Sequence, residues 1–401
     1  MMEFYFQSNL ANLQRMKTQA FLVFTLLLAT TYFAQAAEPV APKFRAVEID
    51  NKIEIGYGVT VADVDGDKKP DIVLADKKQF VWYKNPTWEK HVLAENLTKQ
   101  DNVCIAARDI DGDGKAEIAV GAEWNPGDTV NSGAVFYLVP PKDRRQKWEA
   151  VELHHEPTVH RMRWIQNDSG KFVLLVAPLH GREGAGAKIL TYQMPADPHQ
   201  AWKTSVVSDN LHMTHNFDPV KWSKGPGDDL LLASKEGVYH LINRGSPWKS
   251  FVLAETGTSG FAGAGEVRSG KLAGADGFVA TVEPMHGNQL VVYTDAHRKR
   301  QVLDSSLKEG HALACGDLLR AGSDQIVVGW RTKNSEGKVG IKMFVPKDKE
   351  GKEWKQFPVD DNTMACEDLC LADLNGDGKL DIVASGRATK NVKIYFNEGT
   401  R

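Results

Sequence analysis

The chain has little of what several functional classes require. Its four cysteines in 401 residues are too few for a disulfide scaffold, and a formal net charge of −3 supplies no basic surface for nucleic acid. The Gly-x-Ser-x-Gly motif of serine hydrolases is absent, as is a glycine-rich phosphate loop that opens a helix. These absences argue against nucleic-acid partners and against nucleophilic serine chemistry.

Long apolar runs are also scarce, and the one that exists lies near the N-terminus. Residues 20–33 are mostly apolar, they follow Lys17, and the small-residue sequence Ala34-Gln-Ala36 after them is typical of a cleavage site. The pattern predicts an upstream extension or tag-like segment over 1–15, a signal peptide over 16–36 and a single domain over 37–401. We therefore expect a secreted or periplasmic protein with no membrane span after cleavage.

Three near-identical acidic loops are the most informative feature that is present. They are Asp63-Val-Asp-Gly-Asp-Lys-Lys-Pro-Asp71, Asp109-Ile-Asp-Gly-Asp-Gly-Lys-Ala-Glu117 and Asp373-Leu-Asn-Gly-Asp-Gly-Lys-Leu-Asp381. Each has oxygen donors at positions 1, 3, 5 and 9 and a glycine at position 4, and each runs into an apolar strand instead of a helix, which excludes an EF-hand. The spacing predicts three Ca²⁺ sites, with ligands Asp63, Asp65, Asp67, Asp71, Asp109, Asp111, Asp113, Glu117, Asp373, Asn375, Asp377 and Asp381.

The loops belong to a longer repeat. Seven units of about fifty residues can be aligned, each with an innermost strand, a turn, and two or three further short strands. Four short strands repeated seven times predict an all-β, seven-bladed β-propeller. The fourth-strand pattern is missing after Phe396 but occurs at residues 44–49, so the N-terminal strand is predicted to close the last blade.

Strand direction predicts where chemistry lies. The start of each innermost strand and the end of the second strand must share one face, opposite the acidic loops. Histidines and arginines from different units gather there, and His suits proton transfer or metal ligation while Arg suits a carboxylate. Catalytic candidates are His160, His215, His180, His286, His311 and Tyr57, and substrate-binding candidates are Arg163, Arg182, Arg331, Arg387, Trp124 and Trp330.

The acidic loop followed by Ile-Val resembles the FG-GAP/VCBS repeat family over essentially all of 43–397. That resemblance implies Ca²⁺-stabilised propellers in exported proteins. Segments such as Glu156-Pro-Thr-Val-His-Arg-Met-Arg-Trp164, Met213-Thr-His-Asn-Phe217 and Glu283-Pro-Met-His-Gly287 are also similar to the propeller module of aldos-2-ulose dehydratase and to seven-bladed rhamnose–glucuronate lyases. This narrower resemblance implies cleavage of a sugar carbon–oxygen bond by β-elimination, although the cupin domains that accompany the dehydratase are missing.

Two functions therefore stay open. The sequence favours a carbohydrate lyase or dehydratase acting on a uronate- or keto-sugar, in which His215 or His160 is the base and His180, His286 or Tyr57 is the acid. Arginines, or an additional divalent cation held by some of the histidines, would stabilise the developing anion. The alternative is a non-catalytic propeller that uses the same face to bind a glycan or a protein.

Overall fold

The computed structural model describes residues 38–257, 260–294 and 299–400. The predicted upstream extension and the whole predicted signal peptide with its cleavage site lie outside these ranges. Residues from Pro39 onward form one structural unit. In the described ranges no helix is long and apolar enough to cross a membrane.

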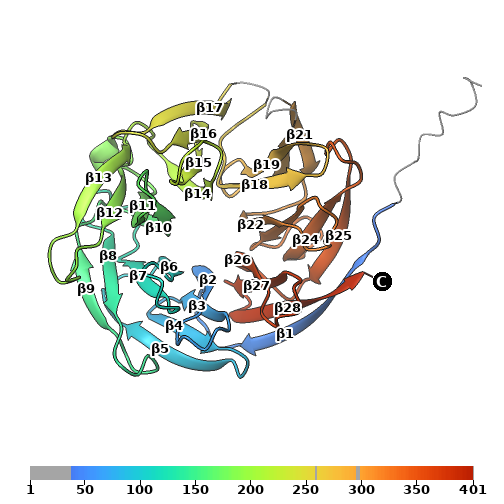
Figure 1. Ribbon diagram of the computed structural model, residues 1–401. Helices are drawn as coiled ribbons and strands as arrows, with labels where there is room; N and C mark the ends of the chain where they lie inside the picture. The colour runs from blue at the N-terminus through green and yellow to red at the C-terminus, as the bar shows by residue number, and fades with distance from the viewer. Residues whose placement is uncertain (1–37, 258–259, 295–298, 401) are drawn as a thin grey trace, which may run out of the picture. The chain divides into compact units, whose positions relative to one another are not determined.

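The unit is a ring of seven sheets, each with four antiparallel strands (Figure 1). The innermost strands are β2 (Gly58–Ala62), β6 (Cys104–Arg108), β10 (Val159–Gln166), β14 (Thr214–Val220), β18 (Glu266–Leu272), β22 (Gly310–Gly316) and β26 (Cys366–Ala372). The second strands are β3 (Asp71–Ala75), β7 (Glu117–Ala122), β11 (Phe172–Pro178), β15 (Asp229–Ser234), β19 (Ala275–Glu283), β23 (Gln325–Trp330) and β27 (Asp381–Gly386). The predicted all-β, seven-bladed propeller is confirmed.

Two outer strands complete each sheet. The third strands are β4 (Gln79–Lys84), β8 (Ala134–Val139), β12 (Ile189–Gln193), β16 (Gly237–Ile242), β20 (Gln289–Thr294), β24 (Gly340–Pro346) and β28 (Asn391–Thr400). The fourth are β5 (Glu89–Glu95), β9 (Glu149–Leu153), β13 (Lys203–Ser208), β17 (Lys249–Glu255), β21 (Lys299–Asp304), β25 (Trp354–Asp361) and, for the last blade, β1 (Pro42–Asp50). A single short 3₁₀ helix, η1 (Arg182–Gly184), is found among the described residues.

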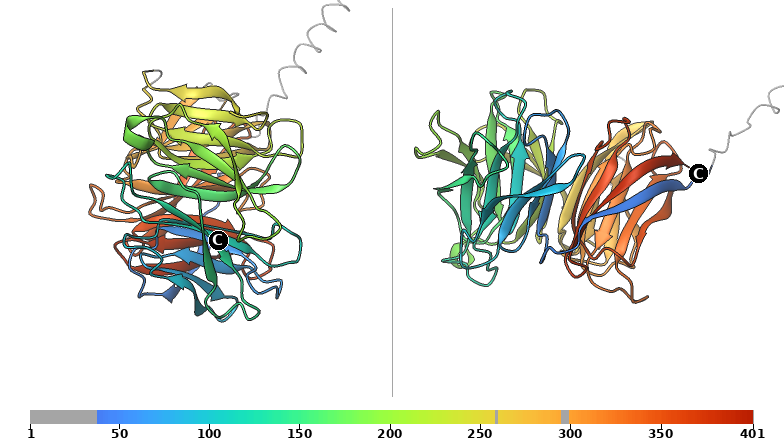
Figure 2. Two further views of the ribbon diagram at one scale, coloured as in Figure 1. Left: turned by 90° about the vertical axis from the view of Figure 1, so that its left-hand side faces the viewer. Right: turned by 90° about the horizontal axis from the view of Figure 1, so that it is seen from below.

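The N-terminal strand closes the ring, as predicted. β1 pairs antiparallel with β28, so the first described strand and the last lie side by side (Figures 1 and 2). Phe44 and Val47 of β1 pack against the cores on either side of this seam. This pairing covers the edge of β28, at which another chain could otherwise pair.

The core lies between neighbouring blades. Every residue of β3, β7, β15, β23 and β27 is buried, because the second strand of a blade is covered on both of its faces. Trp82 of β4 shares one apolar cluster with Ile118 of β7, and Trp330 of β23 shares another with Phe344 of β24. Burial of this apolar surface holds adjacent blades together.

Four innermost strands are interrupted near their first residues. The pairing register shifts between Val159 and Arg161 in β10, between Thr214 and Phe217 in β14, between Gly310 and Ala312 in β22, and between Cys366 and Asp368 in β26. Each shift is a β-bulge, which adds an unpaired residue and re-aims its side chain. The bulges fall at His160, at His215 and Asn216, at His311 and at Glu367.

Removing β1 is expected to open the ring. A chain that starts at Asn51 lacks the partner of β28, so we expect its thermal unfolding midpoint to fall by about 5–10 °C and light scattering to report aggregation. A chain that starts at Glu38 keeps β1 and is the matched control. Equal midpoints for the two chains would contradict closure by β1.

Candidate functional site

Three buried histidines are held by the blade that follows each of them. His160 Nδ1 lies 3.0 Å from the carbonyl oxygen of His215, His215 Nδ1 lies 2.8 Å from that of Gly265, and His311 Nδ1 lies 2.6 Å from that of Glu367. A carbonyl can only accept a hydrogen bond, so each Nδ1 carries the proton and each Nε2 keeps its lone pair. The bulges thus place three imidazoles, all protonated at Nδ1, near the propeller axis.

A fourth histidine arrives from a loop. His286 lies between β19 and β20 with a left-handed backbone, φ 50°, and its Nε2 is 2.7 Å from His215 Nε2. The innermost strand of this blade begins with Glu266 where others carry His, so His286 fills that place in the ring. The ring centroids of His286 and His311 are 4.8 Å apart.

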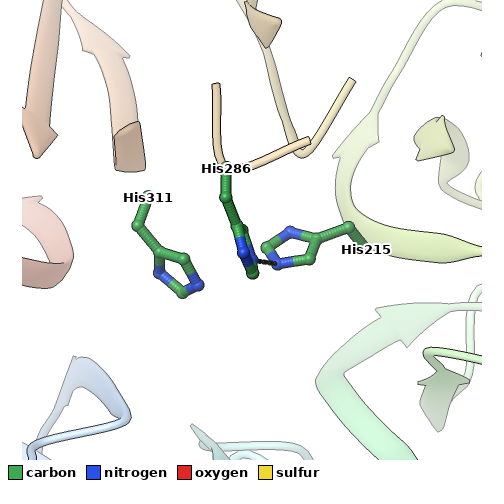
Figure 3. A group of neighbouring side chains, drawn as sticks. All are labelled: His215, His286 and His311. Carbon is green, nitrogen blue, oxygen red and sulfur yellow. Dashed lines mark hydrogen bonds between the residues drawn. The ribbon is translucent and has the colours of Figure 1, made fainter. Parts of the chain in front are cut away.

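These side chains form a candidate metal centre. One ring nitrogen from each of His215, His286 and His311 lies within 4.8 Å of the other two, and all three rings converge on one point (Figure 3). Three neutral imidazoles are the donor set of a catalytic zinc-type site that keeps a position open. Those of His215 and His311 have Nδ1–H anchored on backbone carbonyls, whereas His286 Nδ1 lies 3.5 Å from Arg331 Nη2. The residues present therefore fit a borderline divalent cation better than a hard one.

Burial keeps the cluster uncharged. It lowers the pKa of His160 and His311 well below the usual value, and the nearby guanidinium of Arg161 or Arg331 lowers each further. The pKa of His286 falls to about 2, from burial first and then from His215 and Arg331. Neutral imidazoles are the form that binds a metal or removes a proton.

Arginines and one carboxylate cover the cluster. Glu367 is 1% exposed and accepts from Arg331 Nη1 at 2.9 and 3.0 Å and from Arg387 Nη1 at 2.9 Å. Arg331 also donates to Glu309 at 2.9 Å, whereas Arg387 lies over the Tyr57 ring at 5.2 Å. Arg387 is thus the more open of the two cations.

Tyr57 stands beside this group as a neutral phenol. Its hydroxyl donates to Asp101 at 3.1 Å. Burial, together with the charge of Asp101, raises its pKa to about 12. The hydroxyl therefore keeps its proton at neutral pH.

The remaining candidates are distributed around this cluster. Trp124 lies against His160, with ring centroids 4.9 Å apart. The structure does not bring His180 into the cluster: its Nδ1 faces the carbonyl of His212 at 3.4 Å. Arg182 is exposed and donates to Val130 O, and Trp330 is 4% exposed within the core, where it cannot stack on a ligand.

Sequence reasoning missed Arg161, Glu266 and Asp101. Arg161 Nη1 donates to His160 Nε2 at 3.2 Å, and Glu266 Oε1 lies 3.4 Å from His215 Nδ1. Burial acts to raise the pKa of Glu266, but the hydrogen bond from His215 and the charge of Arg268 outweigh it and lower that pKa. Glu266 could have been found from the repeat, because it aligns with His160 and His215 at the start of its innermost strand.

The three acidic loops share one hydrogen-bonded wrap. In each, the position-1 aspartate accepts from the backbone N–H groups of positions 4 and 6, at 2.7–3.0 Å. The position-4 glycines have φ between 74° and 85°, which side chains with a Cβ disfavour. In the first loop, carboxylate oxygens of Asp63, Asp65 and Asp71 lie within 4.8 Å of one another. In the second loop, those of Asp109, Asp111 and Glu117 do the same.

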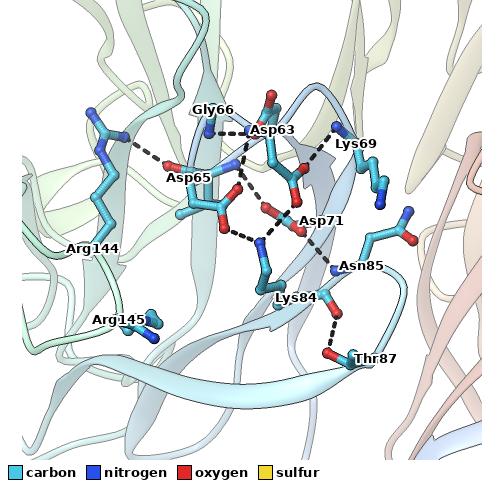
Figure 4. Close-up of polar contacts among 12 residues, drawn as sticks. Asp63, Asp65, Gly66, Lys69, Asp71, Lys84, Asn85, Thr87, Arg144 and Arg145 are labelled. Atoms are coloured by element: carbon cyan, nitrogen blue, oxygen red, sulfur yellow. Dashed lines mark hydrogen bonds and ion pairs between the residues drawn. The ribbon is translucent and has the colours of Figure 1, made fainter.

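The first loop differs from the other two. Lys84 reaches it from β4 and pairs with Asp65, and with Asp67 at 2.8 Å (Figure 4). Position 6 is Lys68, with φ 67°, where the other loops have glycine. The first loop thus carries its own cation and some backbone strain.

Comparison with known protein families agrees with this architecture. Residues 132–296 match "Aldos-2-ulose dehydratase, beta-propeller domain", residues 63–120 match "FG-GAP-like repeat" and residues 105–138 match "FG-GAP repeat". The chain carries FG-GAP repeats. A search of curated protein sequences gave no match.

Solved structures support the fold of this FG-GAP propeller. A chain of the "Crystal Structure of Mitotic Checkpoint Complex" aligns with a TM-score of 0.55 at 13% identity, covering 92% of this chain and 98% of that one. "BBS1N in complex with ARL6DN, soaked with lead" gives 0.55 at 15%, covering 90% and 97%. The extracellular domain of "the putative hybrid two component system BT4673 from B. thetaiotaomicron" gives 0.53 at 11%, covering 88% and 39%. At these identities the likeness concerns the fold alone.

The lowered pKa of His160 predicts acid sensitivity. Below about pH 6.5 the unfolded chain protonates this imidazole and the folded one does not, so stability falls as the pH drops. In a chelator-containing buffer, we expect His160→Gln to reduce the slope of unfolding free energy against pH by up to about 1.4 kcal/mol per pH unit between pH 6.5 and 4.5. Urea unfolding at several pH values measures the slope.

His199→Gln is the matched control, because His199 is a surface residue between Asp197 and Glu149. The slope of this control should not be reduced below that of the parent protein. Identical slopes for the parent protein and His160→Gln would contradict a buried, neutral His160.

Proposed function

We propose that the protein is a carbohydrate-active carbon–oxygen lyase that works by β-elimination or dehydration on a uronate- or keto-sugar. The observation that carries the proposal is the set of His215, His286 and His311, from each of which one ring nitrogen lies within 4.8 Å of the other two. The match to a dehydratase propeller over residues 132–296 supports it, because that range contains His160, His215 and His286.

The chemistry needs a base for the α-proton, an acid for the leaving oxygen and positive charge for the intermediate enolate. His160 is the proposed base, because its Nε2 carries no proton and its ring lies 4.5 Å from that of His215. Arg161 Nη1, which donates to this Nε2 at 3.2 Å, must turn away for the proton transfer. Tyr57 is the proposed acid, because its hydroxyl stays protonated. Arg387 is the proposed contact for anionic oxygens of the substrate.

His215, His286 and His311 would hold a divalent cation in this scheme. When bound, such an ion supplies Lewis-acid stabilisation of the enolate oxygens. Anchoring of the imidazoles of His215 and His311 on backbone carbonyls fixes the donors before any ion arrives.

The second function, a binding propeller without catalysis, is favoured by one observation. His160, His215 and His311 are between 1% and 4% exposed, so they could serve only to tie blades together. Turnover separates the two functions.

Lyase activity predicts a new absorbance. Incubation with uronate-containing polysaccharides should produce the ultraviolet absorbance of a conjugated product, and a separate dehydration assay should test keto-sugars. We expect His215→Ala and His311→Ala each to lower the rate at least 100-fold, because each removes a proposed ligand. Metal analysis of the purified variants should show loss of one ion that the parent protein retains.

His154→Ala, an exposed histidine, is the control and should keep full activity. Retention on a glycan array without turnover of any substrate would favour the binding function. Full activity in both variants would contradict the assignment.

We also propose Ca²⁺ as the ion of the acidic loops, because their oxygen donors are hard and their spacing suits six to eight ligands. The three loops should not bind alike. Lys84 already neutralises Asp65 and Asp67, and a cation entering the first loop must displace it.

Lys84→Met is expected to strengthen Ca²⁺ binding at the first loop about tenfold, because the competing ammonium is gone. Calcium titration followed by calorimetry would show the weakest of the three sites becoming tighter. Lys203→Met is the control, since Lys203 is an exposed residue of β13 in a blade without an acidic loop. Unchanged affinities in Lys84→Met would contradict competition by this lysine.

A further inference from the structure

A cavity of about 900 Å³ occupies the axis of the propeller. All seven innermost strands line it, and it reaches Asp63 and Asp109 at the first and second acidic loops. None of the four clustered histidines lines it. Its volume is in the range of small-molecule binding sites.

Two arginines of β10 that line this cavity, Arg161 and Arg163, have no ion-pair partner among the described residues. Arg161 is 7% exposed, and its Nη2 has no hydrogen-bond partner among the described residues. Arg163 follows two residues later on the same strand and donates to the Asn216 amide oxygen at 3.0 Å. Within the described part of the chain, no carboxylate forms an ion pair with either arginine.

The nearby carboxylates are committed elsewhere. Asp218 accepts from the Ser269 backbone N–H at 2.9 Å, and Asp368 accepts from the Val59 N–H at 2.9 Å. Glu266 accepts from Asn216 Nδ2 at 2.7 Å. These carboxylates balance the charge of the arginines, but they accept no hydrogen bond from Arg161 or Arg163.

A buried cation without a hydrogen-bonded partner is costly. The pKa of Arg163 falls to about 10, because the group lies deep in the ring and Arg268 adds like charge. The buried Nη2 of Arg161 is thus a donor without an acceptor, and Arg163 is a cation without a carboxylate partner. A planar or tetrahedral oxoanion offers acceptor oxygens of the right kind for guanidinium groups.

We propose that the axial cavity binds a small oxoanion, a carboxylate or a sulfate, through Arg161 and Arg163. This site is distinct from the histidine cluster, although Arg161 also touches His160 and so stands between the two. A free inorganic anion and the acidic group of a sugar share this chemistry, and the probes below separate them.

The test uses the full chain with sulfate and with glucuronate, at constant ionic strength set by chloride. Calorimetry and thermal unfolding should report saturable binding to one site, and the tighter of the two probes identifies the source of the anion. Arg163→Gln should weaken that binding at least tenfold. Arg145→Gln, at a surface arginine paired with Asp143, should bind as the parent protein does.

The stability of the variants without added anion is a second measurement. Removing an unpaired buried charge should leave Arg163→Gln at least as stable as the parent protein. Binding should also persist in His311→Ala, so failure of the lyase proposal would not imply failure of this one. No saturable binding of either probe, or equal binding by Arg163→Gln, would overturn the inference.

Discussion

The β-bulges in β10, β14, β22 and β26 are the constraint on which the candidate site depends. A regular strand alternates its side chains between two faces, and here both faces are needed to pack the neighbouring blades. One inserted residue lets the strand keep that packing while an extra side chain turns to the axis. His160, His311 and Glu367 are such residues, and His215 lies in the fourth bulge. Blades that lack this bulge contribute to the site from outside their innermost strand, as Tyr57 and His286 do.

Carbonyl anchoring gives these buried rings a defined chemistry. An imidazole whose Nδ1 donates to the next blade presents Nε2 as an acceptor without any charged partner. Burial penalises the protonated form, so the cluster stays neutral although Arg331 and Arg387 lie close by. Those two cations share Glu367, which limits the positive field at the histidines. A cation bound by the histidines would therefore have neutral ligands, and Glu367 would partly offset the repulsion from Arg331 and Arg387.

The fold and the acidic loops were predictable because they rest on local spacing. The blade formed by β22–β25 has a related loop at the same position. Its Asp317 accepts from the N–H groups of Ala321 and Gly322, and Gln325 replaces the position-9 carboxylate. The wrap persists there without the acidic residues of positions 3 and 5. The site was only partly predictable. A bulge depends on pairing with another strand, and it leaves no mark in the residue pattern of its own strand, so Arg161 could not be distinguished from the other arginines. Trp330 looked accessible from sequence because its burial comes from β24 and the adjoining blade.

The two ends of the axis offer donors of different hardness. Along β26, Glu367 at the start and Asp373 just after the end are separated by about 20 Å of extended chain. Oxygen donors at the loop end suit Ca²⁺, whereas imidazole nitrogens at the other end suit borderline ions such as Zn²⁺ or Ni²⁺. If both proposed sites bind metal, ligand type alone would direct each ion to its own end. Arg161 and Arg163 line the cavity between these ends, and the guanidinium N–H groups that no carboxylate of the described chain accepts are the donors of the proposed oxoanion site.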